Sequence, residues 1–174
     1  MKIEKATILD AETIADINIK VWKTTYQNII SNDALTRRES QKQLIIERIH
    51  ALIKTNTYLI AKIDGMIVGF ICYGSLRDCS NLQKNRTGEI YAIYVLDTFQ
   101  RKGIGKNLMI HAIKDLISKN YKNLLIWGLK NNPHTRFYEK LGGEKMNTRE
   151  IKIFEDKLLE NSYYFEDIKS IIKS

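Results

Sequence analysis

A short basic segment with two glycines is the part of this sequence whose residue types could do chemistry. Residues 100–106 read QRKGIGK and lie between a predicted strand and a predicted helix. Gly103 and Gly105 let the backbone come close to a ligand and turn its N–H groups in one direction. Those donors and the positive end of the helix dipole favour a phosphate. Positive charge is added by Arg101, Lys102 and Lys106. The segment therefore predicts a diphosphate site.

The same pair of glycines is also common in tight turns that bind nothing, and the sequence leaves that interpretation open. The familiar nucleotide-binding loops are absent from this segment. It matches neither GxxxxGK followed by Ser or Thr nor GxGxxG. A P-loop kinase and a Rossmann dehydrogenase are therefore disfavoured.

The elements that position this segment follow from hydrophobic periodicity. Apolar runs predict strands at residues 2–7, 57–63, 66–74, 89–96, 124–129, 144–154 and 158–165. Apolar residues at helical spacing predict helices at residues 10–29, 36–53, 103–117 and 133–141. Asp64 and Gly65 predict a tight hairpin turn between two strands. The order βααβββαβαββ describes a mixed α and β fold, not a strict βαβ repeat.

Length and composition bound the class of protein. The chain has 174 residues, one proline and no linker-like tract, so we expect a single domain over residues 1–174. It begins without a signal peptide and has no uncharged run that could span a bilayer, so we expect a soluble, cytoplasmic protein with no membrane partner. The net charge is +8, but the basic residues are dispersed and no nucleic-acid-binding motif is present, so no nucleic-acid partner is expected.

The two cysteines give no indication of a metal site. Cys72 and Cys79 show neither CxxC spacing nor a nearby His pair, so we expect no bound metal and two reduced thiols. A covalent route through either cysteine is not expected, because no paired base accompanies them.

Two segments of the chain resemble a known family. Residues 93–105, IYVLDTFQRKGIG, resemble the acetyl-CoA motif of the GNAT superfamily of N-acetyltransferases, a hydrophobic strand followed by Q/R-x-x-G-x-G/A at a helix start. Residues 131–143, NNPHTRFYEKLGG, resemble its downstream Asn–Tyr–Gly signature. His134 and Gly143 depart from the family pattern, which usually has a small residue and an aromatic residue there. The resemblance implies the acyl-CoA N-acyltransferase fold, a twisted mixed sheet of about six or seven strands flanked by helices.

The resemblance also implies where acetyl-CoA is held. Backbone groups of Ile93, Tyr94 and Val95 are expected to pair with the pantetheine arm as an added strand would. The expected diphosphate site consists of Gln100, Arg101, Lys102, Gly103, Ile104, Gly105 and Lys106. Asn131, seven residues before Tyr138, stands at the family's position for an asparagine that contacts the cofactor.

Two residues are expected to be catalytic by the same resemblance. The family tyrosine at Tyr138 can protonate the departing thiolate of coenzyme A, since a phenol is a proton donor at neutral pH. Glu89 aligns with a glutamate that takes a proton from the attacking amine in some members. Backbone donors near Val95 would polarise the thioester carbonyl. The alternatives are a core aromatic at Tyr138 and a solvated strand-end charge at Glu89.

The implied activity is direct transfer of an acetyl group from acetyl-CoA to a primary amine of a small molecule. The alternatives are acetylation of protein N-termini or lysines, and a non-catalytic acyl-CoA sensor. Trp22 and Tyr26, one helical turn apart, are expected to contact the acceptor, although aromatics at this spacing are more often core residues. A homodimer that pairs through the C-terminal strands is also expected from the resemblance.

Overall fold

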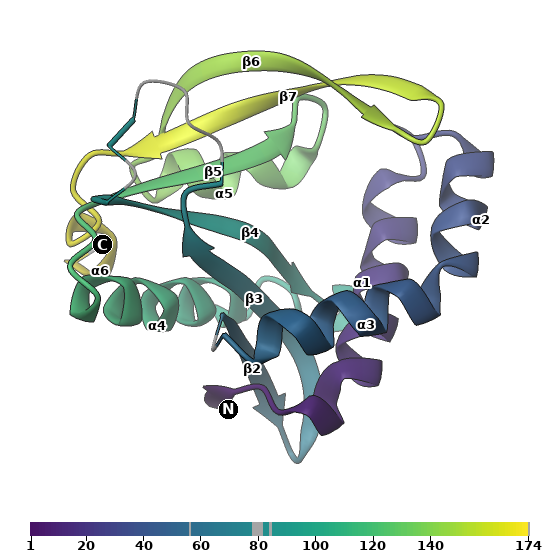
Figure 1. Ribbon diagram of the computed structural model, residues 1–174, viewed down its shortest axis with the longest axis horizontal. Helices are drawn as coiled ribbons and strands as arrows, with labels where there is room; N and C mark the ends of the chain where they lie inside the picture. Colours follow the sequence, from purple (N-terminus) through teal and green to yellow (C-terminus); the bar gives the residue numbers. More distant parts are fainter. Residues whose placement is uncertain (56, 78–81, 84, 174) are drawn as a thin grey trace. The chain divides into compact units, whose positions relative to one another are not determined.

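The computed structural model, drawn in Figure 1, describes residues 1–55, 57–77, 82–83 and 85–173. Within them the chain forms seven strands, six α-helices and three single-turn 3-10 helices. The strands are β1 Lys2–Lys5, β2 Tyr58–Ile63, β3 Met66–Ser75, β4 Thr87–Val95, β5 Asn123–Leu129, β6 Glu144–Ile153 and β7 Asp156–Phe165. The helices are α1 Ala11–Tyr26, α2 Asn32–Ser40, α3 Lys42–Ile53, α4 Ile104–Ser118, α5 Arg136–Lys140 and α6 Ser170–Lys173. The strands are hydrogen-bonded in the order β1-β2-β3-β4-β5-β7-β6. The predicted mixed α and β class is confirmed.

Two compact units make up the chain, and three elements contribute to both. Unit 1 is Met1–Cys72 with Ala92–Met109, and unit 2 is Tyr73–Tyr91 with Ile110–Ser174. The unit boundaries therefore fall inside β3, β4 and α4. A single domain over the whole chain stays a prediction.

Unit 1 is built on antiparallel strands. β2 pairs with β1 on one side and with β3 on the other. The β2–β3 turn has φ of 49° at Asp64 and 81° at Gly65, the two positive values that a primed hairpin turn needs. The predicted hairpin is confirmed. α1 contacts α3, and the buried branched aliphatic side chains of the two helices are Ile14, Ile17, Val21, Ile45, Ile49 and Ile53.

The prediction of one helix over residues 36–53 is wrong, because the segment forms α2 and α3 with a break at Gln41. α2 also begins earlier than predicted, since the Ser31 hydroxyl accepts a hydrogen bond from the Ala34 N–H at 3.2 Å. At the break, the Ser40 hydroxyl donates to the Arg37 carbonyl at 2.9 Å, and such local bonds compete with helix continuation. With α6 added at the end, the element order becomes βαααβββαβαββα.

Unit 2 is organised around β5. β5 pairs in parallel with β4 from Thr87 to Ile90, and antiparallel with β7 along its whole length. Its first half, with Leu124, Leu125 and Ile126 all buried, reads as the continuous apolar run typical of a strand covered on both faces. β7 pairs on its other side with β6, the end strand of the sheet order, which is mostly exposed.

Candidate functional site

The segment with two glycines forms the turn that leads into α4, and it lies in unit 1. Arg101 has a φ of 60° and Gly103 a φ of 77°. Left-handed residues next to right-handed ones turn successive N–H groups toward one side and make a concave anion site. The first N–H groups of the helix add donors that lack an acceptor in a preceding turn. Residues 101–103 are exposed, so this turn fits a diphosphate.

The side chains of Gln100 and Lys102 bind the loop itself. The Gln100 amide nitrogen donates to the Val95 carbonyl and to the Asp97 carboxylate, each at 3.0 Å. The Lys102 ammonium donates to the Thr98 carbonyl at 3.1 Å. These bonds fix the shape of the turn, so the donors that it presents to a ligand are chiefly backbone N–H groups. Direct contact of either side chain with a cofactor stays a prediction.

Asn107, which is not among the predicted site residues, also holds the turn. Its amide nitrogen donates to the Gly103 carbonyl at 3.0 Å, while its own N–H donates to the same carbonyl at 3.0 Å. An amide side chain four residues after the first glycine is the signal that could have identified it.

The last residues of β4 present backbone groups away from β3. The Leu96 N–H donates to the Val68 carbonyl of β3 at 2.9 Å. Since neighbouring residues of a strand point their N–H and C=O groups to opposite edges, those of Val95 and Ile93 point away from β3. On that edge the parallel pairing with β5 covers β4 only as far as Ile90. The backbone groups of Ile93 and the N–H of Val95 are thus suited to pair with an extended ligand, whereas the Val95 carbonyl already accepts a hydrogen bond from Gln100.

Trp22, Tyr26 and Tyr94 lie together in unit 1. The Trp22 indole N–H donates to the Tyr94 hydroxyl at 2.9 Å, and the Trp22 and Tyr26 ring centroids are 5.1 Å apart. Burial raises the pKa of the Tyr94 phenol. A Cβ added at Gly69 of β3 would lie 2.7 Å from the Tyr94 carbonyl oxygen, so the Tyr94 carbonyl faces β3 and not the edge used by Val95.

Arg38 of α2 joins these aromatic residues, and no sequence signal pointed to it. Its guanidinium carbon is 4.4 Å from the Trp22 ring centroid, within the range of a cation–π interaction. Its Nη2 donates to the Asn18 side-chain oxygen at 2.7 Å. Burial lowers the pKa of this guanidinium.

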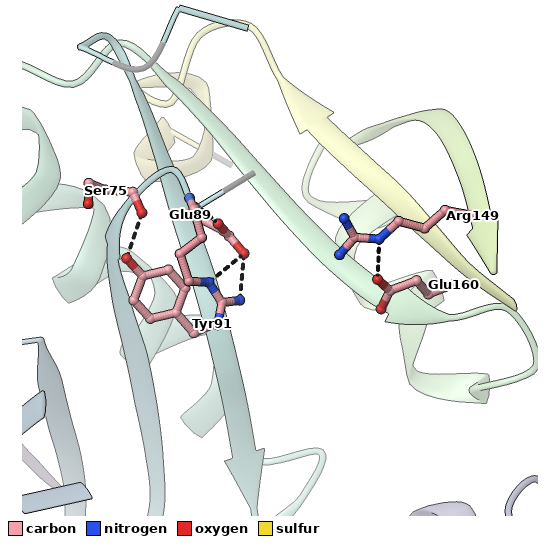
Figure 2. A network of polar contacts seen from close by, with 6 residues as sticks. Ser75, Glu89, Tyr91, Arg149 and Glu160 are labelled. Atoms are coloured by element: carbon pink, nitrogen blue, oxygen red, sulfur yellow. Dashed lines mark hydrogen bonds and ion pairs between the residues drawn. The ribbon is translucent and has the colours of Figure 1, made fainter. Parts of the chain in front are cut away.

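Glu89 is buried in unit 2, and Figure 2 shows it with Tyr91 and Ser75. Its carboxylate is held by Arg77. Its Oε1 accepts from Nη2 of Arg77 at 2.6 Å and from Nε at 3.1 Å, and its Oε2 accepts from the Arg77 backbone N–H at 2.8 Å. The guanidinium also stacks 4.0 Å from the Tyr91 ring centroid, and the Tyr91 hydroxyl donates to the Ser75 carbonyl at 2.6 Å. Glu89 is therefore not a solvated strand-end charge. Its role as a base stays a prediction.

Tyr138 lies on α5 of unit 2 in a group of aromatic rings. Its ring centroid is 5.8 Å from that of Phe137 and 5.4 Å from that of Tyr163. A Cβ added at Gly128 of β5 would lie 2.9 Å from Cγ2 of Thr135 and 3.5 Å from the Tyr138 ring. The glycine thus allows α5 to pack closely on β5, which restrains the Tyr138 ring.

Asn131 is exposed at a pocket of about 390 Å³ in unit 2. The pocket is lined by Lys130, Asn131, Asn132, Pro133, Thr135, Arg136, Glu139, Lys145, Asn161 and Tyr163. The adjacent Asn132 is buried, and its side-chain oxygen accepts from the His134 N–H at 2.9 Å, while the His134 side chain is exposed. The cofactor contact expected of Asn131 stays a prediction.

The departure from the family pattern at Gly143 has a packing explanation. A Cβ added there would lie 2.7 Å from Cζ of Phe165 on β7 and 3.0 Å from the Tyr138 carbonyl oxygen. The Phe165 ring already fills the space that a side chain at position 143 would need.

The described residues contain no group of three or more His, Cys, Asp or Glu side chains placed to hold a metal ion. Cys72 is a buried thiol, and Cys79 lies outside the described residues. In the same part of the chain, no helix combines the length and the apolar character that crossing a membrane requires.

The predicted site residues thus fall into two groups. Unit 1 contains the turn at residues 100–106, the β4 residues Ile93 and Val95, and the pair Trp22 and Tyr26 beside Tyr94. Unit 2 contains Glu89, Asn131 and Tyr138.

The chain is similar to known proteins over most of its length. The sequence profile of the Acetyltransferase (GNAT) family matches residues 22–143. The uncharacterized N-acetyltransferase YuaI of Bacillus subtilis (strain 168) is 24% identical over 169 residues, which are 97% of this chain and 95% of YuaI. A spermidine N(1)-acetyltransferase of Thermoplasma acidophilum is 27% identical over 124 residues, which are 68% of this chain and 72% of that protein.

Solved structures of other proteins share the fold of this chain. The crystal structure of PaiA N-acetyltransferase from Thermoplasma acidophilum in complex with coenzyme A aligns with a TM-score of 0.72 and 23% identity. The alignment covers 91% of this chain and 96% of the PaiA chain.

Proposed function

The chain belongs to the acetyltransferase (GNAT) family of acetyl-CoA-dependent N-acetyltransferases, and from this premise we propose that it acetylates a primary amine of a small molecule. The observation that carries the proposal is the exposed turn before α4, where left-handed Arg101 and Gly103 offer backbone donors to a diphosphate. Similarity to an enzyme named for spermidine supports a small-molecule amine as the acceptor.

Acetyl-CoA supplies an acetyl group activated as a thioester. We propose that the N–H groups of residues 101–106 bind its diphosphate, with Gln100 and Asn107 holding the turn in shape. The outward backbone groups of Ile93 and Val95 bind its pantetheine arm, and the exposed Asn131 side chain contacts it.

Two side chains are proposed to move protons. Tyr138 donates a proton to the departing thiolate, since a phenol with an ordinary pKa of about 10 carries its proton at neutral pH. Glu89 accepts the proton of the acceptor amine through a water. Its Oε1 is occupied by two N–H groups of Arg77, whereas Oε2 accepts one N–H and keeps a second lone pair for that water.

Three further statements belong to this proposal. The two units serve one enzymatic domain. The enzyme acts in the cytoplasm, because acetyl-CoA is an intracellular metabolite. It forms a homodimer through β6, the exposed end strand of the sheet order, which light scattering on the purified protein would detect.

The test combines binding with turnover. Calorimetric titration with coenzyme A is followed by a thiol-release assay over amino acids, polyamines, amino sugars, aminoglycosides and peptides. We expect coenzyme A to bind and one class of small amine to give the highest kcat/KM. Turnover with peptides alone would instead identify a protein acetyltransferase, and binding without any turnover would identify a sensor.

A further inference from the structure

Four side chains of unit 1 converge from three elements, namely Trp22 and Tyr26 of α1, Arg38 of α2 and Tyr94 of β4. We call them the arginine–aromatic cluster. Trp22 links its parts, because the indole N–H binds the Tyr94 hydroxyl while the indole face lies against the Arg38 guanidinium. The cluster thereby joins the two helices to β4.

Arg38 has no carboxylate partner among the residues that the structure describes. Among the described residues, its one hydrogen bond goes to the neutral Asn18 side chain at 2.7 Å, and its enclosed Nε has no acceptor. Burial is the main reason that the pKa of Arg38 is lowered, while Tyr94 raises this pKa and the positive charge of Arg48 lowers it. The cluster is therefore a positive site that its own surroundings leave unneutralised.

Carboxylates are close in sequence but are paired with other cations. Glu39, next to Arg38, binds Lys23 at 2.9 Å. Asp16 of α1 binds Lys42 at 2.6 Å. These ion pairs connect α1 to α2 and to α3, so Arg38 is not needed to supply the electrostatic link between the helices.

The guanidinium still has donors to offer. Of its five N–H groups, Asn18 accepts one and the enclosed Nε carries another, which leaves three on the two terminal nitrogens. A half-buried guanidinium with one face on an aromatic ring is the arrangement in which arginine binds carboxylates in proteins.

We infer that the acceptor amine of this enzyme carries a carboxylate and that Arg38 binds it. This inference rests on the proposed function and specifies its substrate class as amino acids and related amino carboxylates. Tyr94 lies between Ile93 and Val95, the residues proposed to bind the pantetheine arm, so the carboxylate site adjoins the strand that presents the thioester. A polycation such as spermidine would meet repulsion from Arg38 and Arg48.

The kinetic test uses amino acids and their carboxamides as matched acceptors, together with spermidine. Arg38→Met should lower kcat/KM for the acids by about 10- to 100-fold, mainly through KM, and leave the carboxamides within about twofold. Arg38→Lys should restore part of the loss. Arg37→Met removes an exposed charge from the same helix and should change neither series. Equal losses on acids and carboxamides, or a preference for spermidine, would overturn the inference.

A binding measurement separates this inference from the proposed function. In a Trp127→Phe background, the remaining indole is Trp22, whose fluorescence reports on its contact with Arg38. N-Acetylated amino acids should quench it and their carboxamides should not, and Arg38→Met should abolish the difference. If the acids bind in this way but no amine is acetylated, the activity is refuted and the carboxylate site stands. If amines are acetylated but acids and carboxamides quench equally, the carboxylate site is refuted and the activity stands.

Discussion

Replacing the two members of the Arg77–Glu89 pair should affect stability unequally, because one is buried and the other is exposed. The exposed fraction is 2% for the Glu89 side chain and 60% for that of Arg77. Arg77→Met leaves a buried carboxylate with only the backbone N–H at 2.8 Å as a donor. Breaking a buried pair in this way costs about 3–5 kcal/mol, and we expect about 3 kcal/mol, since water can enter where the exposed guanidinium was.

Glu89→Gln should cost less, about 1–2 kcal/mol. The amide oxygen still accepts a hydrogen bond, and the remaining cation at Arg77 is solvated. The double variant should be more stable than the sum of the single changes predicts, by about 1.5–3 kcal/mol, because neither a buried charge nor its partner remains.

The measurement is urea unfolding at pH 7 and 25 °C, followed by circular dichroism, for the parent and the three variants. A larger loss for Glu89→Gln than for Arg77→Met would refute the assignment of Glu89 as the buried member. The same proteins also test the chemistry. If Glu89 is the base, Glu89→Gln lowers kcat/KM by about 100-fold or more at every pH, whereas Arg77→Met keeps the carboxylate and retains more activity.

Five further substitutions have expected outcomes. Gly103→Ala places a side chain at a φ of 77°, and Gly65→Ala places one at a φ of 81° in a turn with open space around it. Each substitution should cost about 1–2 kcal/mol of stability. Only Gly103→Ala should weaken coenzyme A binding, as measured by calorimetry. Gly69→Ala forces the β4 backbone outward at the Tyr94 carbonyl, 2.7 Å from the new Cβ, and should weaken coenzyme A binding even in protein that remains folded by circular dichroism. Tyr138→Phe should lower kcat by about 100-fold with the Kd for acetyl-CoA unchanged, and unaltered turnover would exclude its role as an acid. The pKa of Glu4 is lowered from 4.5 to about 2, first by a hydrogen bond from Lys2 and then by one from Lys62. The contribution of Glu4 to stability is therefore complete above pH 4.5 and is lost as the pH falls toward 2. A pH series of thermal melts should show this loss in the parent and not in Glu4→Gln.

Features that depend on neighbouring residues could be predicted from the sequence. The Asp64–Gly65 hairpin and the left-handed Gly103 follow from the conformational freedom of glycine and the preferences of tight turns. The switch from strand to helix around Gly103 follows from the change of apolar period from two to 3.6. These local rules were enough to predict the mixed fold and the turn that leads into α4.

Features that depend on side chains distant in sequence could not be predicted. The break at Gln41 lies in a segment with neither proline nor glycine, so helical periodicity alone joined α2 to α3. No sequence pattern identifies Arg77, although it donates three hydrogen bonds to Glu89. Phe165 explains the glycine at position 143 only because β7 pairs with β6, where Glu144 lies opposite Tyr164.

The amino-acid sequence alone determined the fold class, the family resemblance and the turn at residues 100–106, because each depends on residues within one or two adjacent elements. Tertiary structure determined how the charged side chains are paired: it buries Glu89 under Arg77 and leaves Arg38 against Trp22 without a carboxylate among the described residues. The physical reason is that burial and ion pairing are set by whichever groups the folded chain brings within a few ångströms, and hydrophobic periodicity carries no information about which charges those will be.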